Sequence, residues 1–120
     1  MLYAVLCYND EAAIGAWSKE KDAEVMAHHE GVLKTFASQR KLGPVARLMP
    51  TTAATTLRDN GEKIVLDGPF AETKEQLLGF YVFDCKSLEE ALEMARPLSM
   101  PGGCLEIRPI FYFNAGSGIA

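Results

Sequence analysis

The sequence predicts an α+β fold in which two β-α-β halves share one antiparallel sheet. Apolar runs at residues 2–8, 79–85 and 104–113 have the length and composition typical of strands. Stretches with apolar residues at helical spacing alternate with these runs. An Asn60-Gly61 turn between β-prone segments adds a hairpin between the two halves. We therefore expect a single domain over residues 1–120, with a loose tail at 114–120.

The first strand is expected at residues 2–8, where both faces are apolar. A strand with one solvated face alternates apolar and polar side chains, so this strand is predicted to be covered on both sides. Ser18 is a good N-cap for a helix over residues 19–40, which Gly43-Pro44 would end. One apolar stripe follows from the helical spacing of Val25, Met26, Val32, Leu33 and Phe36.

A short strand at 44–49 and a hairpin of 53–58 with 62–66 are expected next. The hairpin leads to a turn at Asp67-Gly68-Pro69, and the Thr73–Gln76 pattern predicts one helical turn. After the strand at 79–85, Ser87 and Glu90 form a capping box for a helix that Pro97 ends. That helix is expected to face the core through Leu88, Ala91, Leu92 and Ala95.

The last strand is predicted at 104–113. Its apolar side chains fall on one face, and Glu106, Arg108 and Tyr112 fall on the other. Together these elements define a ferredoxin-like βαβ-βαβ sandwich with an inserted hairpin and both helices on one sheet face. The other face would stay uncovered although its strands are apolar. We therefore expect a homodimer that packs sheet against sheet.

Composition excludes several classes of protein. The 12 basic and 16 acidic side chains give a net charge of −4 without a basic cluster, so no nucleic-acid partner is expected. No apolar run has membrane-spanning length and none resembles a signal peptide, which predicts a cytoplasmic protein with no membrane contact. Cys7, Cys85 and Cys104 lie in or beside apolar runs and are expected to be buried thiols.

His29 is the strongest candidate for chemistry because it lies in the middle of the apolar helical stripe. His28 lies at the edge of that stripe and is expected to be solvated. The two rings point about 100° apart on a helix, so they cannot chelate one metal, and neither a metal nor a cofactor is expected. Asp67 is the natural partner that would orient His29 as a general base. Two plainer interpretations remain: a core histidine bound to a backbone carbonyl, and a turn aspartate that caps amides.

Weaker candidates for substrate binding are Glu72 and Lys74 in the loop after the turn, and Arg108 on the last strand. The loop charges are more simply a solvated surface. Glu106 and Arg108 share a strand face, and a rim ion pair is the simpler interpretation of them. A carboxylate-binding role for Arg108 is the alternative.

The run Asp67-Gly-Pro-Phe-Ala-Glu-Thr-Lys-Glu75 resembles the signature of the DGPF proteins, a branch of the YCII-related family. The similarity continues in order along nearly the full chain, through Met26-Ala-His-His29, Gly79-Phe-Tyr81, the helix start at Leu88–Ala91, Gly102-Gly103 and Glu106-Ile-Arg-Pro109. The resemblance implies a dimeric ferredoxin-like α+β barrel with a histidine and aspartate active-site pair at His29 and Asp67. It also implies a regulatory, sigma-factor-associated role in some branches.

Three functional hypotheses follow. The first is a cofactor-free enzyme that moves a proton on a small organic substrate with His29 and Asp67. The second is a ligand-binding or protein-interaction module without turnover. In the third, the pair only stabilises the fold, by about 1–3 kcal/mol.

Overall fold

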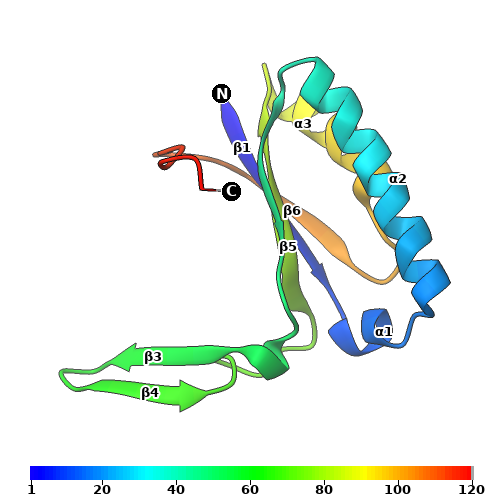
Figure 1. The fold of residues 1–120 in the computed structure, drawn as a ribbon. Coiled ribbons are helices and arrows are strands. Elements are labelled where there is room, and N and C mark those ends of the chain that lie inside the picture. Colours follow the sequence, from blue (N-terminus) through cyan, green and yellow to red (C-terminus); the bar gives the residue numbers. More distant parts are fainter. Residues whose placement is uncertain (120) are drawn as a thin grey trace.

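The computed structural model describes residues 1–119 and confirms a mixed α+β fold (Figure 1). Four strands form an antiparallel sheet in the order β2-β5-β1-β6, and a separate hairpin projects from it. This strand order is consistent with a ferredoxin-like arrangement. The elements are β1 (Leu2–Asn9), α1 (Glu11–Gly15), α2 (Lys19–Ser38), β2 (Leu42–Arg47), η1 (Thr51–Ala53), β3 (Thr55–Asp59), β4 (Lys63–Asp67), β5 (Gln76–Asp84), α3 (Leu88–Ala95), η2 (Arg96–Leu98) and β6 (Cys104–Pro109).

The core lies between the sheet and the two long helices. On β1, burial alternates strictly, and Tyr3, Val5 and Cys7 face the helices. Phe83 from β5 is fully buried and packs edge to face against Phe36 of α2, with ring centroids 5.3 Å apart. Burying a side chain of this size contributes roughly 1.5–3 kcal/mol. This packing, rather than helix propensity, therefore holds α2 on the sheet.

Both predicted helix starts are confirmed by their caps. The Ser18 hydroxyl accepts a hydrogen bond from the amide of Lys21, and the Ser87 hydroxyl accepts one from Glu90. The predicted core face of α3 is partly wrong, because Leu88 and Leu92 are exposed. The residues of α3 and η2 that pack inward are Ala91, Met94, Ala95 and Leu98.

The boundaries around β2 differ from prediction. The helix α2 ends at Ser38, and Arg40 follows with a left-handed φ of 58°. The strand β2 runs from Leu42 to Arg47, so it begins two residues earlier and ends two residues earlier than the predicted 44–49, and it includes Gly43. A register irregularity between Leu42 and Val45 accommodates Pro44 on this edge strand, where a missing N–H is tolerated. The segment before α2 contains a short helix that the sequence pattern does not predict, α1, whose N-cap is Asp10.

The predicted hairpin is confirmed, and it forms an arm, defined here as residues 48–75. Strands β3 and β4 pair with each other in a sheet of their own, and the arm extends away from the body (Figure 1). Leu57 and Val65 are cross-strand partners and stay largely exposed. The helical turn predicted at Thr73–Gln76 is wrong, because the Gln76 side chain donates to the Thr73 carbonyl and Gln76 begins β5.

The sheet face opposite the helices, called the open face here, has no helix over it (Figure 1). It carries Leu2, Ala4, Leu6 and Tyr8 of β1, which are only half-buried, together with Phe80. The strand β6 ends at Pro109 instead of residue 113, and Phe111 is fully exposed, so the predicted apolar face of 111–113 is wrong. Cys104 is also exposed, contrary to prediction, whereas Cys7 and Cys85 are buried.

Candidate functional site

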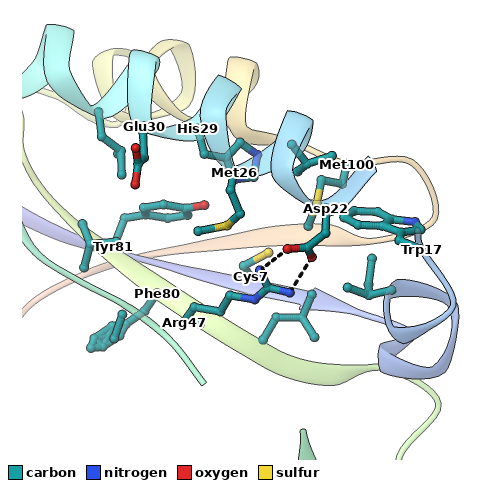
Figure 2. A pocket seen from close by; sticks show the side chains of 17 residues that line it. Cys7, Trp17, Asp22, Met26, His29, Glu30, Arg47, Phe80, Tyr81 and Met100 are labelled. Atoms are coloured by element: carbon teal, nitrogen blue, oxygen red, sulfur yellow. Dashed lines mark hydrogen bonds and ion pairs between the residues drawn. The ribbon is translucent and has the colours of Figure 1, made fainter. Parts of the chain in front are cut away.

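A cavity of about 110 Å³ lies between α2 and the helix-covered side of the sheet (Figure 2). We call it the α2 pocket. Its wall is mostly apolar, with a few polar side chains at defined places. The lining comes from α2, β1, β2, β5, the segment around α1 and the turn before β6. It includes Cys7, Ile14, Trp17, Asp22, Val25, Met26, His29, Glu30, Leu33, Val45, Arg47, Leu78, Phe80, Tyr81 and Met100. An apolar recess with a few polar groups is the usual form of a small-molecule site.

The helix α2 supplies one wall because its side chains repeat on a single face. Asp22, Met26, His29 and Leu33 follow one another at steps of three or four residues, so they line the same side of the helix. The Ser18 cap fixes where the helix begins and therefore which residues face the sheet. The inward position of His29 predicted from helical spacing is confirmed.

His29 is half-buried in this wall, and its ring has no hydrogen-bond partner within residues 1–119. Burial lowers the pKa of His29, and the nearby charges of His28 and Arg47 lower it further. The imidazole is therefore neutral at pH 7 and able to accept a proton. It is His28, exposed on the neighbouring face, that binds a backbone carbonyl, with its Nε2 2.8 Å from the oxygen of Pro97.

An ion pair stands at one end of the pocket. Arg47, the last residue of β2, donates from Nη2 to Oδ1 of Asp22 over 2.9 Å and from Nη1 to Oδ2 over 3.3 Å (Figure 2). The hydrogen bond from Arg47 lowers the pKa of Asp22, and the same bond raises the pKa of Arg47, so both stay charged. This pair joins the first turn of α2 to the edge strand of the sheet.

Gly79 permits this arrangement. It lies opposite Arg47 in the β2–β5 register, and a Cβ placed there would collide with the carbonyl oxygen of Ala46. Only a glycine lets the edge strand approach β5 closely enough at this point. The position of Arg47 at the pocket therefore depends on the absence of a side chain at residue 79.

The other predicted site residues lie outside the α2 pocket. Asp67 ends β4, opposite Thr55, and Glu72 and Lys74 are exposed in the arm's return segment. The arm lies apart from α2 (Figure 1), and within residues 1–119 no hydrogen bond joins Asp67 to His29. Arg108 lies on the open face, where its Nε is 3.5 Å from Oε1 of Glu106. The structure thus brings none of these four residues to His29 within one chain.

Sequence reasoning missed Asp22, Arg47 and Tyr81. Asp22 and Arg47 are 25 positions apart, and no local pattern indicates that α2 and β2 bring them together. Tyr81 lies in an apolar strand, where nothing in the local pattern distinguishes it from a core residue. A signal was available for Arg47: it is two residues after Val45 and shares a face with it.

Within residues 1–119 no group of three or more His, Cys, Asp or Glu side chains could hold a metal ion. The same residues include no helix long and apolar enough to cross a membrane. The fold and the pocket together define a small α+β protein with a histidine-lined recess beneath its long first-half helix.

The chain belongs to the YCII-related domain family, whose match covers residues 1–114. A relative from Rhizobium meliloti (strain 1021), described as an uncharacterised protein, is 59% identical over 120 residues and spans 97% of each chain. These similarities confirm the family inferred from the Asp67–Glu75 run.

Proposed function

We propose that this chain binds a small organic molecule in the α2 pocket and that His29 moves a proton on it as a general base. The observation that carries the proposal is the His29 ring itself, which lines an apolar recess, has no hydrogen-bond partner within residues 1–119 and has a lowered pKa. A neutral imidazole accepts a proton from a substrate C–H or O–H, and the imidazolium returns it to another atom. Side chains alone perform this chemistry.

We further propose that the working unit is a homodimer in which the open faces pack together, giving a dimeric α/β barrel. The open face exposes apolar side chains at the centre of the sheet, and an uncovered apolar face favours association. The arm supports the same proposal. A two-stranded hairpin is marginally stable alone, and this one exposes Leu57 and Val65.

In this dimer the arm of one copy would complete the pocket of the other, so that Asp67 orients His29 of the partner. Glu72 and Lys74 lie on the same arm and would accompany Asp67, and Arg108 would lie at the interface. The support is the placement of these residues: within residues 1–119 the arm extends away from the sheet and its helices (Figure 1).

A mixing experiment tests the site and its shared nature together. The Asp67→Asn chain is labelled with ¹⁵N in its histidines and mixed with unlabelled His29→Gln chain after mild unfolding and refolding. Only hybrids place a native Asp67 against a labelled His29. We expect the apparent pKa of labelled His29 to rise on mixing, because a carboxylate favours the imidazolium. A titration curve that is identical with and without the second chain would contradict the shared site.

A second candidate function, binding without turnover, is favoured by the exposed apolar pair Leu57 and Val65 on the arm. On this hypothesis the pocket retains a metabolite and the arm docks a protein partner with a regulatory role. It predicts a ligand that remains bound through purification, which mass spectrometry of denatured protein detects. Turnover that is lost in His29→Gln while ligand binding remains would favour the enzyme instead.

A further inference from the structure

The α2 pocket contains a second polar group, the Tyr81 hydroxyl, which makes no hydrogen bond to the surrounding core. Tyr81 is 8% exposed, and its hydroxyl has no hydrogen-bond partner within residues 1–119. Every fully buried side-chain oxygen or nitrogen in this part of the chain is paired, so the Tyr81 hydroxyl must border the open space. Figure 2 shows that it turns toward Met26, inside the pocket. A hydroxyl left without a partner is unfavourable, and a hydrogen bond to a ligand would satisfy it.

The charged end of the pocket is also not sealed. The side chains of Arg47 and Asp22 are 50% and 37% exposed, and their two hydrogen bonds use only part of the donor set of the guanidinium. An arginine fork matches a carboxylate with two parallel bonds. Asp22 therefore occupies the position that the carboxylate of a ligand would take.

Size and charge limit the ligand further. An apolar cavity of about 150 Å³ holds benzene, so a cavity of about 110 Å³ encloses part of a six-membered ring or a branched chain of similar bulk. The surrounding Met26 and Met100 adapt to different shapes. Asp22 faces Arg47, the only cationic side chain of the lining, and Glu30 adds a second carboxylate to the wall, so a dianion such as a phosphate ester would be repelled.

We propose that the α2 pocket binds a small monocarboxylic acid with a compact apolar body. Its carboxylate replaces Asp22 on Arg47, and an oxygen at its far end accepts a hydrogen bond from Tyr81. This inference rests on the proposed function and names the ligand class of that same pocket. His29 lies between the two ends, next to the body of the ligand.

Burial, with a smaller effect from Cys7, raises the pKa of Tyr81 to about 12, so the phenol stays protonated and donates across the physiological range. A carbonyl or hydroxyl oxygen is therefore the expected acceptor. The hydrogen bond would place that oxygen beside the imidazole, where the lowered pKa keeps His29 unprotonated. The ligand carbon next to this oxygen is then the atom from which His29 can remove a proton.

Binding of defined probes to the full-length protein tests the ligand class without an activity assay. Benzoate and its neutral analogue benzamide are titrated into ¹⁵N-labelled protein, and amide shifts around the pocket report affinity. We expect benzoate to bind at least about tenfold more tightly than benzamide, since a hydrogen bond to a charged group is worth more than a neutral one. Equal affinity of the two probes, or no shift with either in the millimolar range, overturns the proposal.

Variants locate the contact. Arg47→Gln should weaken benzoate binding about tenfold, whereas Arg96→Gln, which removes an exposed arginine paired with Glu93 outside the pocket, should leave it unchanged. Asp22→Asn should strengthen benzoate binding, because the guanidinium loses its competing carboxylate. Benzoate binding that is weakened by Arg96→Gln and not by Arg47→Gln would contradict the assignment. Weakening by Asp22→Asn in a protein with an unchanged amide spectrum would contradict it as well.

A third variant tests the far end. Tyr81→Phe should weaken 4-hydroxybenzoate while leaving benzoate unaffected, and equal losses for both acids would overturn the role of Tyr81. The proposed proton transfer is judged separately by the titration of His29. If benzoate binding depends on Arg47 but His29 does not titrate, the proton transfer is refuted and the ligand class stands. If His29 titrates but benzamide binds as tightly as benzoate, the ligand class is refuted and the proton transfer stands.

Discussion

The two faces of the central strand β1 are both apolar but have different surroundings. On β1, Tyr3, Val5 and Cys7 are at most 6% exposed beneath the helices, while Leu2, Ala4 and Leu6 on the same strand remain half-buried. Residue type therefore does not decide which side chains form the core; the presence of a covering layer does. The helix-covered face is closed by α2 and α3 and contains the α2 pocket, whereas the open face has no helix over it within residues 1–119 (Figure 1).

The largest expected effect is a difference in the free energy of unfolding between two matched Phe→Ala variants on β5, one on each face of the sheet. Phe83→Ala should lower the free energy of unfolding by about 3–5 kcal/mol, because Phe83 is fully buried against Phe36. Phe80→Ala, on the open face, should cost clearly less at low protein concentration. Urea denaturation at two protein concentrations measures the free energy of unfolding of both variants. Equal losses for the two variants in dilute protein would contradict the difference between the faces.

The next effect concerns assembly. Leu6→Arg places a charge at the centre of the open face, opposite Phe80, and should convert the proposed dimer into monomers. Lys34→Glu, an exposed charge reversal on α2, is the matched control and should leave the mass unchanged. Sedimentation velocity distinguishes these outcomes. A wild-type protein that sediments as a monomer at all concentrations would refute sheet-against-sheet association.

A smaller effect is expected from the caps that hold the covering helices. Ser87→Ala removes the acceptor for the Glu90 amide and should lower the free energy of unfolding by about 1 kcal/mol. Ser18→Ala should do the same for α2. Thermal and urea unfolding give the values. If Ser18→Ala also alters the titration of His29, the cap positions the pocket as well as the helix.

The smallest effect concerns pH and acts on the helix-covered face alone. The pKa of His29 is lowered in the folded protein, so below its ordinary value of 6.5 the unfolded chain binds the proton more readily. Stability from the neutral ring is present above that pH and is lost as pH falls through it. His29→Gln should therefore flatten the decline of stability between pH 7 and pH 5. An unchanged pH dependence in this variant would mean that His29 ionises equally in both states.

Local chemistry made much of the fold predictable. Ser18 and Ser87 mark helix starts, the Asn60-Gly61 turn marks the hairpin, and helical spacing places His29 inward. Each of these features is determined by residues a few positions apart, so a local sequence pattern is sufficient to predict it.

The remaining features depend on contacts between distant segments. Asp22 meets Arg47 only after β2 docks on β5, and the open hydroxyl of Tyr81 depends on how α2 is spaced above the sheet. The prediction of a helical turn at Thr73–Gln76 is wrong because the pairing of Gln76 with Asn9 in the sheet overrides the local capping pattern. The approach of Asp67 to His29 stays a prediction, since it requires a second chain.

Gly79 has a consequence for how this protein can vary. Any side chain at that position would push the edge strand β2 away from β5, and Arg47 would move with it. The pairing of β2 with β5 and the position of the Arg47 charge at the pocket therefore both depend on the glycine at residue 79. Relatives that keep a glycine at this position are therefore expected to keep the β2–β5 pairing, and with it the place of residue 47 at the pocket.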